Sequence, residues 1–112
     1  MKKIIILILG IASGYACSNS SAPKGLISED KMVEVLVDIH MAEGMASSLP
    51  IPYDSSKKIY PIFEKEVFLK HNIEDSVYMK SFEYYLRDAK TMERIYSRTI
   101  DSLALKEKLG DQ

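Results

Sequence analysis

Apolar side chains recur at intervals of three and four residues through most of this 112-residue chain. The spacing is clearest where Tyr78, Phe82, Tyr85, Leu86 and Ala89 stand at i, i+4, i+7, i+8 and i+11, which places them along one side of a helix. No long segment alternates apolar and polar residues with the period of two that a half-buried strand needs. The spacing therefore predicts an all-α protein.

Capping and turn residues divide the chain after Leu26 into four expected helices. Ser28 is a candidate N-cap for the first, Asn72 can take the left-handed conformation that ends the second, and Asp88 can cap the fourth. The expected helices cover residues 29–47, about 56–71, 75–87 and 89 to about 108. Short connections favour an irregular bundle of these four helices.

Pro61 leaves two versions of the second helix open, because an interior proline loses a backbone hydrogen bond. One version is a kinked helix, and the other is a short turn followed by a helix that starts at Pro61 or Ile62. The predicted core of the bundle consists of nine apolar residues, Val35, Leu36, Ile39, Phe63, Val67, Phe82, Tyr85, Ile95 and Leu103.

The first sixteen residues have the layout of a secretory signal. Lys2 and Lys3 precede an apolar run, and small residues follow it. Residues 4–16 are too few to cross a bilayer, which takes about 20 residues as a helix. We expect a cleavable signal over 1–16, a tether over 17–26, a helical domain over 27–109 and a tail over 110–112.

Cys17 is the only cysteine and directly follows this leader. Gly14-Tyr15-Ala16-Cys17 resembles a bacterial lipobox, with the departure that Gly14 stands where an aliphatic residue is usual. A lone thiol cannot form an internal disulfide. The alternative is an ordinary secreted protein with a spare cysteine. We expect lipidation of Cys17, with two or three acyl chains that hold the protein on a membrane.

Charge and motifs narrow the function classes. Without Lys2 and Lys3, the formal net charge of −1 becomes −3, which offers no basic field for nucleic acid. The sequence shows no nucleophile-plus-base arrangement, no Gly-rich phosphate loop and no paired Cys motif. We expect no enzyme activity and no cofactor.

His40 and Glu43 are the one polar irregularity on the first helix, because both fall in or beside its apolar arc. They stand at i and i+3 and are therefore neighbours. A metal site or acid–base pair is one interpretation, although two ligands are few and His71 has no ligand-like spacing around it. The favoured interpretation is a half-buried polar pair that meets Tyr84, Tyr85 or Arg87.

Two further groups could contact a ligand or a partner. Tyr78, Tyr84, Tyr85 and Tyr96 could stack on sugars or bases, but core packing is the favoured interpretation. Met41 and Met45 lie on the same side of the first helix as Asp38, and exposed methionines make an adaptable binding surface. They are the candidate partner-facing patch.

The mature chain resembles an uncharacterised family of Bacteroidota lipoproteins, classed as a domain of unknown function. The resemblance covers about residues 26–103, and Glu74 and Ala89 are local departures from the family pattern at two helix starts. The segments that carry it are LIS (26–28), MVEVLVDIHMAE (32–43), KHNI (70–73), SFEYY (81–85) and IYSRTI (95–100). The resemblance implies a small helical envelope lipoprotein and transfers no catalytic residues.

These observations lead to two functional hypotheses. The first is a membrane-anchored, non-enzymatic interaction module with a protein partner in the cell envelope. The second is a small-ligand or metal-binding envelope protein that uses His40 and Glu43. In the phylum that the resemblance indicates, acidic residues just after the lipidated cysteine accompany surface display. Residues 18–22 contain none, so we expect the outer membrane with the domain facing the periplasm.

Overall fold

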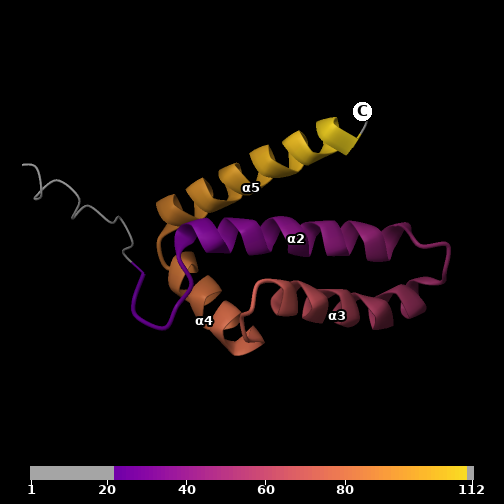
Figure 1. Ribbon diagram of the computed structural model, residues 1–112, viewed down its shortest axis with the longest axis horizontal. Coiled ribbons are helices and arrows are strands. Elements are labelled where there is room, and N and C mark those ends of the chain that lie inside the picture. Colours follow the sequence, from indigo (N-terminus) through magenta and orange to yellow (C-terminus); the bar gives the residue numbers. More distant parts are fainter. Residues whose placement is uncertain (1–21, 111–112) are drawn as a thin grey trace, which may run out of the picture.

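The computed structural model describes residues 22–110, and these residues contain four helices and no strand. The prediction of an all-α protein is therefore confirmed for the described part of the chain. The helices are α2 (Glu29–Ser48), α3 (Tyr53–Lys70), α4 (Asp75–Leu86) and α5 (Ala89–Gly110) (Figure 1). The expected signal and Cys17 lie outside the described residues.

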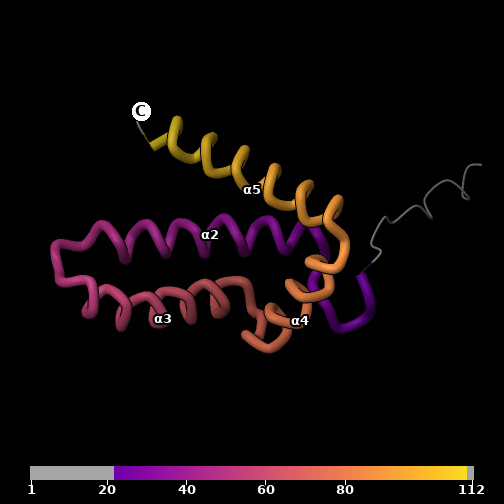
Figure 2. The backbone as a smooth tube through the Cα atoms, turned by 180° about the vertical axis from the view of Figure 1, so that it is seen from behind, coloured from indigo at the N-terminus to yellow at the C-terminus, as the bar shows by residue number. Residues whose placement is uncertain are grey.

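Helix α2 is the centre of the molecule. It lies between α3 and α5 in both backbone views, and α4 crosses at the end where α2 begins (Figures 1 and 2). Contacts follow the same order, since α2 touches all three other helices and makes its most extensive contacts with α3 and α5. The helix is therefore covered on two sides. Its buried residues are Met32, Val33, Val35, Leu36, Val37, Ile39, Ala42 and Ala46.

Two apolar clusters form the core. One joins the first half of α2 to α4 and α5, around Leu36, Tyr85 and Ile95. The other joins the middle of α2 to α3, around Ile39 and Phe68. Ile73 and Tyr78 pack against both clusters.

Six of the nine predicted core residues are buried: Val35, Leu36, Ile39, Val67, Tyr85 and Ile95. Phe63, Phe82 and Leu103 are only partly buried and pack at the edges of the two clusters. The predicted core also left out residues of α2 that are buried, namely Met32, Val33 and Val37. A helix with neighbours on two sides buries more than one stripe.

The predicted caps are confirmed where local chemistry determines them. Ser28 Oγ accepts a hydrogen bond from the Lys31 N–H at 3.1 Å, as an N-cap does. Asp88 accepts from the Lys90 N–H and from the Thr91 hydroxyl at the start of α5. Asn72 has a φ of 53° and ends α3, in the left-handed conformation.

Helix α3 differs from the prediction at its start and in its middle. It begins at Tyr53, three residues before the expected position, and its N-cap is Pro52. Pro61 lies inside a continuous helix, so the version with a separate short turn was wrong. Pro61 is exposed. Water can therefore reach the carbonyl of Lys57, which loses its usual i+4 donor at the proline.

The segment before α2 is hydrogen-bonded to α4. The Ile27 N–H donates to Ser81 Oγ at 3.0 Å, and the Tyr85 hydroxyl donates to the Ile27 carbonyl at 2.8 Å. Just upstream, the Leu26 N–H donates to the Pro23 carbonyl across a turn in which Gly25 has a φ of 92°. This turn needs glycine, because other residues rarely adopt that conformation. The entry of the chain into the domain is therefore fixed.

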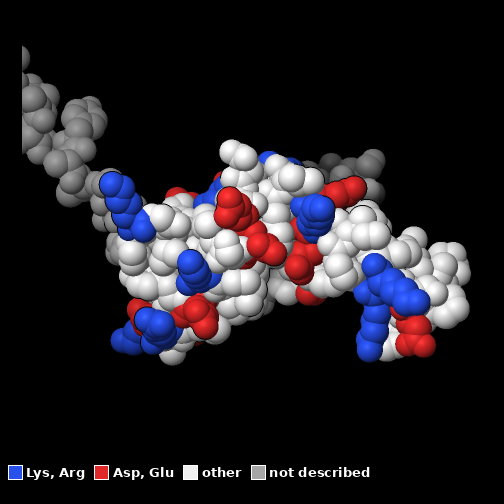
Figure 3. All heavy atoms as spheres, turned by 90° about the horizontal axis from the view of Figure 1, so that it is seen from below, with Lys and Arg blue, Asp and Glu red and all other residues white. Residues whose placement is uncertain are grey.

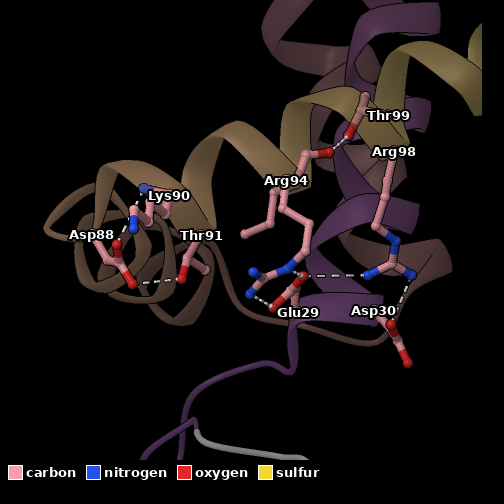
Figure 4. Close-up of polar contacts among 9 residues, drawn as sticks. Glu29, Asp30, Asp88, Lys90, Thr91, Arg94, Arg98 and Thr99 are labelled. Atoms are coloured by element: carbon pink, nitrogen blue, oxygen red, sulfur yellow. Dashed lines mark hydrogen bonds and ion pairs between the residues drawn. The ribbon is translucent and has the colours of Figure 1, made fainter.

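Arginine pairs join the start of α2 to α5 (Figure 4). Arg94 donates to both carboxylate oxygens of Glu29, at 2.6 and 2.8 Å, and Arg98 reaches Asp30 at 2.7 Å. The hydrogen bond from Arg94 holds the pKa of the Glu29 carboxyl below its ordinary value, against the opposing effect of burial. These pairs set the position of α5 beside the first turn of α2.

Candidate functional site

Asp38 is the centre of a polar cluster that joins three helices. His71 Nε2 lies 2.7 Å from Asp38 Oδ2, Lys70 Nζ lies 2.9 Å from the same oxygen, and Lys106 Nζ lies 3.8 Å from Oδ1. The side chains of Asp38 and His71 are only 13% and 8% exposed. An ionised carboxylate can only accept hydrogen bonds, so the imidazole Nε2 donates to it.

The electrostatics of Asp38 follow from these partners. Burial alone would raise the pKa of its carboxyl, but hydrogen bonds from Lys70 and His71 and the charges of Lys70 and Lys106 lower it overall. Asp38 therefore stays ionised at neutral pH. The cluster borders a hollow of about 310 Å³ that Val37, Ser102 and Lys106 also line.

The sequence did not reveal the Asp38 cluster. Helical spacing places Asp38 on the polar side of α2, and no ligand-like spacing surrounds His71 in the sequence. The structure brings them together because the end of α3 returns to the middle of α2. These contacts hold α3 and α5 against α2.

His40 and Glu43 contact each other, but in a more exposed place than expected. His40 Nδ1 lies 3.3 Å from Glu43 Oε2, and both side chains are more than a third exposed. Of the expected partners, Tyr85 is engaged elsewhere, because its hydroxyl donates to the Ile27 carbonyl. Instead, the Tyr60 hydroxyl donates to Glu43 Oε1 at 3.4 Å, and the Tyr96 ring lies 6.4 Å from the His40 ring.

The actual partners come from α3 and α5, on the side of α2 away from Asp38. Burial, with the nearby carboxylates of Glu64 and Glu43, raises the pKa of Tyr60. Burial, with Tyr96 and the same carboxylates, raises the pKa of Tyr78 to about 12. Both phenols are therefore neutral hydrogen-bond donors at physiological pH. Neither is placed to act as a base.

The tyrosines are packing residues for the most part. Tyr85 is buried, and Tyr78, Tyr84 and Tyr96 are partly buried against the first core cluster. Tyr78 lies between Phe68 and Phe82, with ring centroids 5.2 and 5.9 Å away. These distances are typical of aromatic pairs in a protein core.

Met41 and Met45 line an open hollow between α2 and α3. Their side chains are 41% and 55% exposed. The hollow measures about 340 Å³, and Ala42, Phe63 and Val67 supply the rest of its apolar surface. Asp38, Glu66 and Lys70 add charge to its lining. We call this feature, with its two methionines, the methionine hollow.

Within residues 22–110, no group of three or more His, Cys, Asp or Glu side chains could hold a metal ion. Within the same residues, no helix is both long and apolar enough to cross a membrane. Cys17 lies outside them.

The comparisons with known proteins identify the family. Residues 23–109, which include all four helices to within one residue, match the family described as Domain of unknown function (DUF4296). The searches of curated proteins and of solved structures found no match. Because the match covers most of the chain, from the turn before α2 almost to the end of α5, this protein belongs to the DUF4296 family.

Proposed function

We propose that this protein is a lipid-anchored lipoprotein of the bacterial cell envelope and that its helical domain is a non-enzymatic interaction module. The proposed anchor is Cys17, which follows a secretory leader and precedes a polar Ser-rich segment. The proposed location is the outer membrane, with the domain facing the periplasm. The proposed partner is another protein of the envelope.

The methionine hollow is the observation that carries the interaction proposal. Large apolar side chains at the surface of a small domain usually mark a contact with another molecule when they gather in one place. Methionine side chains are flexible and polarizable and adapt to different partner shapes. An open hollow lined by Met41, Met45 and Phe63 fits an apolar side chain or the apolar face of a partner helix.

The first prediction tests this hollow through its two methionines. A Met41→Gln and Met45→Gln double variant should lose a partner that the wild-type protein captures from detergent-solubilised envelopes. Loss of two buried methionine contacts should weaken binding at least tenfold, since each apolar side chain contributes about 1.5–3 kcal/mol when fully buried. The measurement is the yield of each co-purified protein by quantitative mass spectrometry.

Met79→Gln is the matched control for the double variant. Met79 lies on α4 and is 58% exposed, close to the exposure of Met45, but it does not line the hollow. The control should capture the partner as the wild type does. Equal capture by the double variant and by the control would contradict the proposal, and so would capture of no specific protein by the wild type.

A further inference from the structure

The connection between α2 and α3 exposes an unbroken apolar run. Leu49, Pro50, Ile51, Pro52 and Tyr53 follow one another, and all five are exposed, with Tyr53 at 72%. We call these five residues the hairpin tip. A run of consecutive exposed apolar residues is unfavourable in water and is normally kept for contact with another molecule or a membrane.

The hairpin tip has a defined backbone. The Ile51 N–H donates to the Leu49 carbonyl at 2.8 Å, and the Ser55 and Ser56 N–H groups both donate to the Pro52 carbonyl at 3.0 Å. Two prolines restrict the chain further. Because the tip is already ordered, little conformational entropy is lost when it inserts into another environment.

Basic side chains stand beside the apolar tip. Lys57 Nζ lies 4.6 Å above the ring of Tyr53, and Lys58 follows in the same turn of α3. In the space-filling view, basic side chains border the uncharged end of the molecule where α2 and α3 join, and acidic side chains lie among them (Figure 3). Tyrosine with flanking lysines is typical of membrane–water interfaces, where lysine contacts anionic headgroups.

The tip lies at the opposite end of the α2–α3 pair from the entry of the chain (Figure 1). The α2 helix has 20 residues, which corresponds to about 30 Å. Cys17 is five residues before Ala22, a separation of at most about 18 Å of extended chain. A domain tethered this closely can lie with the long axis of α2 along the membrane, so that its far end reaches the same surface.

We propose that the hairpin tip is a second membrane contact, which inserts Leu49, Ile51 and Tyr53 into the headgroup region of an anionic bilayer. Lys57 and Lys58 pair with anionic headgroups there. This inference rests on the proposed lipid anchor at Cys17. The two contacts, one at each end of the domain, hold it flat on the membrane and fix the orientation of the methionine hollow.

The chain contains no tryptophan, so a single introduced tryptophan reports on one position. The test uses the lipidated protein, with the whole chain from Cys17 onward, in phosphatidylethanolamine–phosphatidylglycerol vesicles with brominated acyl chains. Tyr53→Trp places the reporter in the tip. Leu69→Trp is the matched control, because Leu69 is 70% exposed on the same helix but lies near its other end.

The proposal predicts that the tryptophan fluorescence of the Tyr53→Trp variant shifts to shorter wavelength on vesicles and is quenched by brominated lipid. The tryptophan fluorescence of the Leu69→Trp variant should be unchanged. Lys57→Gln and Lys58→Gln, added to the reporter, should each lower the ratio of inserted to free tip about fivefold, since a lysine near an anionic surface contributes about 1 kcal/mol. Equal quenching of the two reporters, or none, overturns the inference.

Two further outcomes separate this inference from the proposed function. If neither reporter variant floats with the vesicles, the lipid anchor itself fails. If both float but the Tyr53→Trp emission shifts only when envelope proteins are added, the tip binds a protein and the membrane inference is wrong.

Discussion

At the scale of single residues, Asp38 shows where sequence patterns stop being informative. A helical wheel places it opposite the apolar stripe of α2, which predicts a solvated side chain. In the structure it is nearly buried, because α3 and α5 both approach α2 there. Its partners Lys70, His71 and Lys106 lie far along the chain, and no local pattern connects them. The same reason explains the unexpected partners of His40 and Glu43.

Asp38→Asn should destabilise the domain at neutral pH. It should also make the free energy of unfolding fall less steeply as the pH is lowered. The pKa of Asp38 is lowered from 3.8 in the folded state, so its stabilising effect is complete above the unfolded pKa and is lost as the pH falls through the lower folded pKa. Loss of the charged hydrogen-bond acceptor should cost about 1–3 kcal/mol at pH 7. The measurement is the free energy of urea unfolding between about pH 7 and pH 2.

The exposed residue Asp101 supplies the control for this titration. Asp101→Asn should retain the wild-type decline in stability below about pH 5, whereas Asp38→Asn should decline less steeply. Some decline should persist in both variants, because Glu29 also has a lowered pKa. An Asp38→Asn curve that coincides with that of the wild type would mean that the Asp38 cluster does not stabilise the fold.

At the scale of helices, the ends that sequence predicted well are those set by one or two neighbouring residues. Ser28, Asp88 and Asn72 each act on the backbone within a few positions, so their roles can be read locally. The start of α3 could not be read this way. Pro52 provides no side-chain cap, and the hydroxyl of Ser56, where the helix was expected to start, donates to the Ala46 carbonyl of α2.

Pro61→Ala should stabilise the protein, because Pro61 lies inside α3 and supplies no backbone N–H. The regained hydrogen bond and relief of steric conflict are opposed by the greater freedom of the unfolded chain, which leaves a gain of about 2 kcal/mol. Chemical unfolding would measure it. Pro52→Ala, at the N-cap, should change stability much less. A Pro61→Ala variant that is no more stable than the wild type would show that α3 accommodates the proline without cost.

At the scale of the whole molecule, helical spacing was sufficient to predict the all-α class and four helices but not which helix is central. The choice depends on contacts between segments far apart in sequence. Val33 and Val37 were omitted from the predicted core because a single apolar stripe was assumed for α2, whereas α3 and α5 both cover this helix. The exposed methionine pair was recognisable from the sequence, whereas the hollow beside it required α3 to be placed.

The methionine hollow, the hairpin tip and the segment before α2 together describe a domain with a defined orientation. The backbone of Ile27 is hydrogen-bonded to the side chains of Ser81 and Tyr85, so the chain leaves the domain at one fixed point. The hairpin tip marks the far end of α2 (Figure 1). In the proposed account, a lipid at Cys17 anchors the first end, the tip contacts the bilayer at the second, and the hollow between α2 and α3 receives a partner.

The anchor at Cys17 is the central claim, and membrane fractionation of a Cys17→Ser variant tests it most directly. The wild type should incorporate a labelled fatty acid and sediment with membranes, because two or three acyl chains hold a protein stably. Cys17→Ser should lose the label and leave the membrane fraction, while Ser18→Ala should behave as the wild type. An unlabelled Cys17→Ser protein that still sediments fully with membranes would contradict the account.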